Sequence, residues 1–138
     1  MAEEKRCWLY TRIDAPEDAH GCLKAQEKEL LDFAAREGYE VAGTASDLGN
    51  GWSLYRPGIA RVIEAAKDEL FHVLLIKNTD IICESNGDAL GLLMYLYETG
   101  IETYTVQGQF IDVHKSFREL LQKISRIPEK FTQDTPAK

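Results

Sequence analysis

Apolar and polar residues alternate along this chain with two different periods, which take turns from one end to the other. Residues 7–13 alternate with a period of two, which predicts a β-strand. Residues 22–37 instead place Leu23, Leu30 and Ala34 on one face, as in an amphipathic helix. The same reasoning predicts three more strands and three more helices, at 39–45, 71–77 and 101–106 and at 59–68, 88–99 and 113–127.

This succession of strand and helix predicts an α/β domain with three layers. A mostly parallel sheet of four to five strands would carry helices on both faces. The run at 71–77 is almost continuously apolar, which is typical of a central strand buried on both sides. A turn at Gln107–Gly108 would start a brief return strand through Ile111. We expect residues 1–127 to form the domain and residues 128–138 to form a polar tail after Pro128.

Length and composition favour one soluble domain. The chain has 138 residues, of which 44% are hydrophobic and 28% are charged. No apolar run has the length of a membrane span, and the charged start MAEEKR does not resemble a signal peptide. These features predict a cytoplasmic protein without a membrane partner.

The charge balance and the cysteines limit the kinds of site that we expect. The formal net charge is −7, whereas a domain that holds DNA by itself is normally basic. DNA is therefore expected to bind only weakly, or through a partner. Cys7, Cys22 and Cys83 lack the spacing of zinc ligands, and Cys7 and Cys83 lie in apolar runs typical of buried thiols. We expect no metal and no cofactor.

Several charged residues follow the predicted strands, and their roles are open at this stage. Because function collects at the carboxyl ends of parallel strands, Arg12 with Asp14, Asp47 and Asp80 would share one edge. One hypothesis is an acidic cluster of these aspartates that binds Mg²⁺ or phosphate, although Arg12 and Arg56 would compete as counter-ions. Alternatively, Arg12 pairs with Asp14, and Asp80 caps a turn.

Four short motifs occur in order on these elements. They read YTRID at 10–14, LKAQ at 23–26, DLGNG with RPG at 47–58, and KNTD at 77–80. They are similar to the Y-x-R-x-S, L-x-x-Q, D-x-G-x-S-G with R-P-G, and K-x-x-D-R-L-x-R motifs of the serine recombinases, the resolvase/invertase family. The resemblance covers roughly residues 7–112, and it implies a resolvase-like catalytic domain.

The resemblance implies a specific chemistry, the cleavage and rejoining of DNA by a nucleophilic serine. In that family a serine attacks a DNA phosphodiester and forms a 5′-phosphoserine link during strand exchange, while arginines stabilise the developing charge. Carried over by position, the resemblance implies an active site at Tyr10, Arg12, Asp14, Gln26, Arg56 and Asp80.

The chain departs from the family pattern at the residues that matter most for cleavage. Asp14 stands where the nucleophilic serine is expected, Ile81 and Glu84 replace two arginines, and Asn50 replaces the serine of the Ser-Gly pair. A carboxylate nucleophile would form an acyl phosphate, which is uphill from a phosphodiester, and its charge would repel the scissile phosphate. We therefore expect the recombinase chemistry to be lost.

The last predicted helix leaves two alternatives open. In the resembled family, members assemble through helices that pack across subunits, and we expect the helix here to be a shortened counterpart with no DNA-binding module after it. Its apolar stripe either remains such an interface or covers the chain's own sheet. The first alternative implies a homodimer, or a hetero-oligomer with an active recombinase of a mobile element. The stripe consists of Val113, Phe117, Leu120, Leu121, Ile124 and Ile127.

Overall fold

The structure is a computed structural model of the chain, and it describes residues 5–49, 56–82 and 86–124. Strands and helices alternate in the predicted order, which confirms the α/β class. The elements are β1 (Arg6–Ile13), α1 (Cys22–Glu37), β2 (Glu40–Leu48), α2 (Pro57–Lys67), β3 (Val73–Ile76), the 3₁₀ turn η1 (Thr79–Ile81), α3 (Asn86–Glu98), β4 (Glu102–Thr105) and α4 (Val113–Ile124).

The four strands form one parallel sheet in the order β2-β1-β3-β4. β1 is central and pairs with β2 along its whole length, from Arg6 opposite Glu40 to Ile13 opposite Leu48. The predicted return strand is reduced to one antiparallel bridge between Tyr104 and Phe110. The prediction was four to five strands, and the described residues form four.

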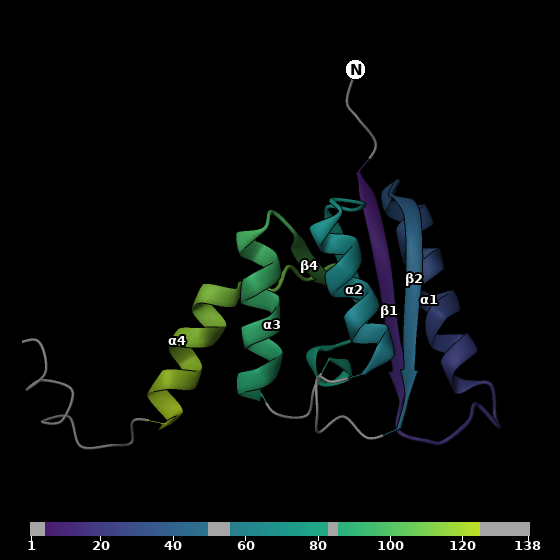
Figure 1. Cartoon of the computed structure of the whole chain (residues 1–138), viewed down its shortest axis with the longest axis horizontal. Coiled ribbons are helices and arrows are strands. Elements are labelled where there is room, and N and C mark those ends of the chain that lie inside the picture. The colour runs from purple at the N-terminus through teal and green to yellow at the C-terminus, as the bar shows by residue number, and fades with distance from the viewer. Residues whose placement is uncertain (1–4, 50–55, 83–85, 125–138) are drawn as a thin grey trace, which may run out of the picture.

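Successive side chains of β1 point to opposite faces of the sheet, and each face is covered by its own helices (Figure 1). Cys7 and Leu9 pack with α1 on one face, whereas Trp8 and Tyr10 pack with α2 and α3 on the other. This arrangement confirms the three predicted layers. It also directs the even-numbered residues at the end of β1 towards α2.

Several boundaries differ from the prediction by one or two residues, and two of the differences, at the end of β2 and the start of α2, bear on the site. β2 was expected to end at residue 45, but it continues to Leu48 because β1 supplies hydrogen-bonding partners that far. α2 was expected to start at residue 59, but it starts at Pro57, whose fixed φ suits the first helical position. Asp47 therefore belongs to a strand and lies close to the start of α2.

The cysteines with described side chains behave as two different kinds of thiol. Cys7 is fully buried, and burial raises its pKa to about 11, which confirms the predicted buried thiol. Cys22, the first residue of α1, is exposed. Cys83 lies outside the described residues.

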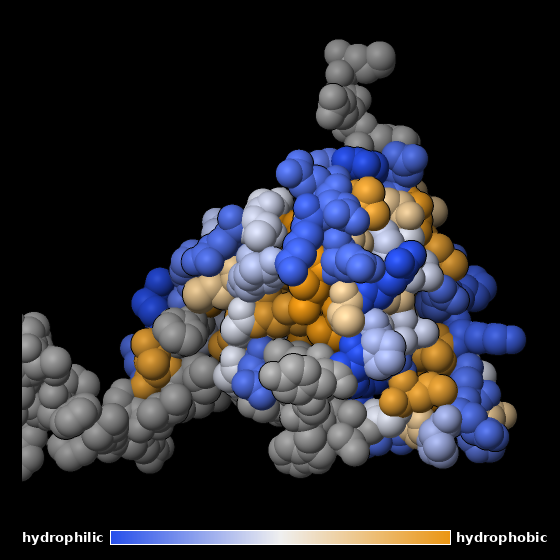
Figure 2. All heavy atoms as spheres, in the orientation of Figure 1, coloured by the Kyte–Doolittle hydropathy of each residue, from blue (hydrophilic) through white to orange (hydrophobic). Residues whose placement is uncertain are grey.

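α4 packs against α3 at the edge of the molecule, away from α1 (Figure 1). Val113 is buried, whereas Leu121, two turns further on, is 47% exposed. Apolar surface appears on this side of the molecule as well as over the centre (Figure 2). The predicted continuation to residue 127, and the tail from residue 128, lie outside the described residues. Within the described part of the chain, no helix has the length and hydrophobicity that crossing a membrane requires.

Candidate active site

The end of β1 is held by a side chain that takes the place of a neighbouring strand. β3 pairs with β1 only as far as Leu9, so the main chain of Arg12 has no strand partner on that side. Gln26 of α1 fills the position: its Oε1 accepts from the Arg12 N–H at 3.0 Å, and its Nε2 donates to the Arg12 carbonyl at 3.1 Å. Gln26 is only 7% exposed, and it continues the ladder beyond the end of β3.

The side chain of Arg12 is buried and bonded to the backbone of two other segments. Its Nε donates to the carbonyl of Ile81 at 3.0 Å, and its Nη1 donates to the carbonyl of Gly49 at 2.8 Å. The residue is 6% exposed. The planar guanidinium can satisfy acceptors in different directions at once, and here it joins the ends of β1 and β2 to η1.

Arg56 approaches the same turn from the other side. It is the N-cap residue of α2, with an extended backbone at φ −137° and ψ 145°. Its Nη2 donates to the carbonyl of Ile82, the residue directly after η1. The Nε and Nη1 atoms of Arg56 are buried without a hydrogen-bond acceptor among the described residues.

Asp47 has a structural role that sequence reasoning missed. Its Oδ1 accepts from the Gly58 N–H at 2.8 Å, and its Oδ2 accepts from the Ile59 N–H at 3.1 Å and from the Tyr10 hydroxyl at 2.7 Å. The carboxylate therefore caps the start of α2 from a neighbouring strand. Burial, together with this hydrogen bond from the hydroxyl, raises the pKa of Tyr10 well above that of an ordinary phenol.

These bonds argue against the acidic-cluster hypothesis. Both oxygens of Asp47 are used by α2 and Tyr10, so the residue cannot join a Mg²⁺ shell without uncapping the helix. Across residues 5–49, 56–82 and 86–124, no group of three His, Cys, Asp or Glu side chains could hold a metal ion. The side chain of Asp80 lies outside the described part, and its backbone lies in η1.

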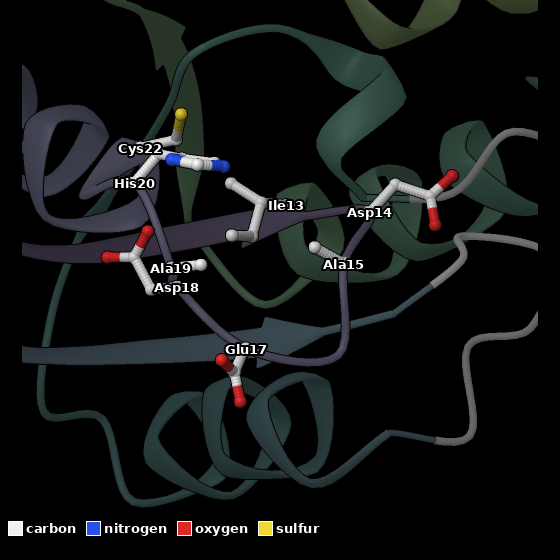
Figure 3. Close-up of a pocket in the computed structure, with 8 residues that line it drawn as sticks. All are labelled: Ile13, Asp14, Ala15, Glu17, Asp18, Ala19, His20 and Cys22. Atoms are coloured by element: carbon white, nitrogen blue, oxygen red, sulfur yellow. The ribbon is translucent and has the colours of Figure 1, made fainter.

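Asp14 lies directly after β1 and is exposed. It lines a cavity of about 340 Å³ together with residues of the loop that leads into α1 (Figure 3). The carboxylate of Asp14 points away from His20 and Cys22, which lie at the other end of the cavity. The other lining residues are Ile13, Ala15, Glu17, Asp18 and Ala19.

The acidic residues of this cavity are not equivalent. Asp18 caps α1, because its Oδ1 accepts from the Leu23 N–H at 3.1 Å and its Oδ2 accepts from the Lys24 N–H at 3.2 Å. These backbone hydrogen bonds lower the pKa of Asp18. The Asp14 carboxylate, at one end of the cavity, is therefore not used in capping α1, whereas Asp18 is.

The structure brings together four of the six predicted site residues. Tyr10 and Arg12 come from β1, Gln26 bonds to the backbone of Arg12, and Arg56 meets Arg12 at the turn after β3. Asp14 lies two residues beyond Arg12 and faces solvent. Asp47, which entered the prediction only through the acidic-cluster hypothesis, lies at the centre of these hydrogen bonds.

Solved structures with a similar fold include catalytic domains of an integrase and of serine recombinases. The N-terminal catalytic domain of TP901-1 integrase aligns with a TM-score of 0.73 and 22% identity, over 94% of this chain and 98% of that chain. A resolvase family site-specific recombinase from Streptococcus pneumoniae gives 0.72 and 21%, over 97% and 95%. The C-terminal catalytic domain of ISC1926 TnpA, an IS607-like serine recombinase, gives 0.68 and 20%, over 86% and 79%.

The fold is therefore that of a serine-recombinase catalytic domain. The sequence also matches the family described as "Resolvase, N terminal domain" over residues 7–135. The chain belongs to this family, which confirms the resemblance inferred from the four motifs.

Proposed function

We propose that this member of the serine-recombinase family does not cleave DNA and acts by associating with a recombinase-type domain. The observation that carries the proposal is Asp14, which occupies the position of the nucleophilic serine in the Y-x-R-x-S motif. Three further features support it: the chemistry of a carboxylate nucleophile, the loss of cations and, among the described residues, the lack of a replacement nucleophile.

A carboxylate in this position makes strand exchange unfavourable. If an Asp14 oxygen attacked the phosphorus, the bond from phosphorus to the 3′ oxygen would break, and that oxygen would leave as a hydroxyl after taking a proton. The product would be an acyl phosphate, which lies well above the phosphodiester in energy. A serine phosphodiester lies close to the DNA phosphodiester in energy, so the serine intermediate can accumulate and then be passed on, whereas the acyl phosphate would form only in trace amounts and fall back to the starting DNA.

Fewer cations are available to stabilise the transferring phosphoryl group. Ile81 stands in place of an arginine and is 9% exposed, so its side chain packs in the core. Arg12 and Arg56 are present, but each donates to backbone carbonyls. One arginine aimed at a transferring phosphoryl group is worth about 10³-fold or more in rate. Glu84, which replaces the second arginine, lies outside the described residues.

Among the described residues, no side chain next to Asp14 offers a substitute for the serine. Cys22 is the one thiol that lines the described cavity, and it lies at the opposite end from Asp14, beside His20 (Figure 3). Attack by this thiol would require the phosphate to sit away from Arg12 and Arg56, which are held at the turn after β3.

Association is supported by α4. Its first turn is anchored by the buried Val113, while Leu121 leaves apolar surface exposed. The net charge of −7 disfavours independent DNA binding, because phosphate contacts supply much of the affinity for DNA. A second copy of the chain, or an active relative with basic DNA-binding surface, fits such a helix.

The proposal is tested by trapping covalent protein–DNA adducts. The purified protein is incubated with a pool of random-sequence duplexes that carry nicks, since a nick prevents religation and accumulates any covalent intermediate. An active serine recombinase with its own site is the positive control. We expect no adduct. An adduct that forms with the natural chain and disappears in Asp14→Ala would refute the proposal.

A further inference from the structure

The buried Arg12 and the half-buried Arg56 meet at consecutive backbone carbonyls after β3. Arg12 donates to the carbonyl of Ile81, and Arg56 donates to the carbonyl of Ile82. The side chains of Ile81 and Ile82 are themselves buried, at 9% and 1% exposure. The turn is thus fixed to the core by its side chains, and to β1 and α2 by two cations at its carbonyl end.

We propose that Arg12 and Arg56 form a latch that holds the turn at residues 79–82 and, through it, the start of α3. The latch has a second arm, because Arg12 also donates to the carbonyl of Gly49 after β2. One side chain therefore joins three segments that are far apart in the sequence. The arginine pair acts on the protein's own backbone.

The latch links the site to the surface proposed for association. The turn precedes α3, and α3 carries α4 on its outer side (Figure 1). Release of the turn would let α3 and α4 shift relative to β1 and α2. Its use in regulation rests on the proposed function, but the latch itself does not, since it can be measured on the free protein without DNA.

Two amide groups report directly on the turn. The Ile81 N–H donates to the carbonyl of Asn78 at 3.2 Å, and the Ile82 N–H donates to that of Thr79 at 3.0 Å. Both hydrogen bonds exist only while the turn is formed. Reference amides elsewhere are those of His72, bonded to Arg6 at 2.9 Å, and of Ile101, bonded to Leu96 at 2.9 Å.

The experiment is native-state amide hydrogen exchange by NMR on the full chain and on substituted chains. Arg12→Lys supplies a single nitrogen that cannot span the carbonyls of Ile81 and Gly49 together. Arg56→Met removes the donor while keeping a similar stem, and Arg56→Lys keeps one charged donor. Arg61→Lys is the control, since the side chain of Arg61 is 63% exposed.

We expect Arg12→Lys and Arg56→Met to speed exchange at Ile81 and Ile82 by about tenfold or more, as for loss of a charged hydrogen bond. Exchange at His72 and Ile101 should change much less. Arg56→Lys should restore most of the protection, and Arg61→Lys should leave it unchanged.

Unchanged exchange at Ile81 and Ile82 would overturn the latch. The same increase at all four amides would also overturn it, because that result shows loss of global stability alone. If Arg12→Lys does not fold, the comparison of Arg56→Met with Arg56→Lys decides the question. None of these outcomes depends on whether the domain cleaves DNA, so this inference and the proposed function can fail separately.

Discussion

The hydroxyl of Tyr10 donates a hydrogen bond of 2.7 Å to Oδ2 of Asp47, and the same carboxylate caps α2. This pair explains why two separate family motifs belong together. Tyr10 comes from the YTRID stretch of β1, and Asp47 opens the DLGNG stretch at the end of β2. The pair joins the central strand, its neighbour and the first turn of α2.

Removing the Asp47 carboxylate should destabilise the whole domain. Asp47→Ala loses a helix cap, which is worth about 1 kcal/mol, and leaves the buried Tyr10 hydroxyl unpaired at about 1–3 kcal/mol. We expect the free energy of unfolding to fall by about 2–4 kcal/mol in urea titrations. Tyr10→Phe should cost about 1 kcal/mol.

The double substitution measures the interaction energy between Tyr10 and Asp47 apart from the contacts that each makes with other residues. Because the two residues touch, Asp47→Ala with Tyr10→Phe should cost less than the sum of the single changes. If Asp47→Ala were as stable as the natural chain, the carboxylate would have no capping role, and the acidic-cluster hypothesis would regain support.

Gly58 is required by its closeness to Asp47. A Cβ at residue 58 would lie 2.5 Å from Oδ2 of Asp47 and 2.6 Å from the backbone oxygen of Ser46. Gly58→Ala should therefore lower the free energy of unfolding by about 1–3 kcal/mol. Gly91→Ala is the matched control within α3, where a Cβ meets nothing within 4 Å.

The control substitution, Gly91→Ala, should increase stability instead of lowering it. Alanine in a helix interior is favoured over glycine by roughly 0.5–1 kcal/mol, so Gly91→Ala should raise the thermal midpoint slightly. If both variants lost the same free energy of unfolding, the contact with Asp47 would not be the reason why residue 58 must be glycine.

The buried thiol of Cys7 should make the free energy of unfolding fall as the pH rises into the alkaline range. Burial raises its pKa from 9.0 to about 11, so the folded chain keeps the thiol neutral where the unfolded chain ionises it. Its contribution is complete below about pH 9 and is lost as the pH rises towards 11. The loss amounts to about 2–3 kcal/mol, at 1.36 kcal/mol per pKa unit.

Denaturation curves at several pH values check this prediction. Cys7→Ala should be less stable at neutral pH but should lose stability less steeply between pH 9 and 11. Tyr10, Tyr39 and Tyr104 also have raised pKa values, so part of the slope remains in the variant. Parallel curves for the two chains would rule out a contribution from Cys7.

The exposed face of α4 should control association. Leu121→Lys places a charge on the apolar stripe, whereas Gln122→Lys adds the same charge at the next exposed position. Light scattering over a range of concentrations should show that Leu121→Lys weakens self-association, or association with an added recombinase, by about tenfold or more. Equal behaviour of the two variants would place the interface elsewhere.

Most of the fold follows from hydrophobic period alone. The change from a strand pattern to a period near 3.6 is visible for most elements, the exception being the continuously apolar β3, and Gly38 ends α1 with a left-handed φ of 78°, as glycine commonly does at a helix end. The end of β2 and the start of α2 were less predictable, because residues distant in the sequence stabilise them: β1 pairs with the end of β2, and Asp47 caps the start of α2. Pro57 was the available clue to the start of α2.

The site was predictable in its residues but not in its hydrogen bonds. The motifs identified Tyr10, Gln26 and Arg56 by position, yet a motif does not say which atom a side chain binds. Gln26 completes a strand ladder because β3 ends before it reaches Arg12, and Asp47 caps a helix because α2 begins next to the end of β2. Both contacts depend on the folded sheet and not on the local sequence.

The most direct test is the state of Asp14 after exposure to DNA. Following incubation with the nicked duplexes, nuclease and protease digestion leaves a peptide that contains residue 14, and its mass is measured with and without hydroxylamine, which cleaves acyl phosphates. We predict an unmodified peptide under both conditions. A peptide that carries a nucleotide on Asp14, and loses it with hydroxylamine, would contradict the proposal that this recombinase domain has lost its chemistry.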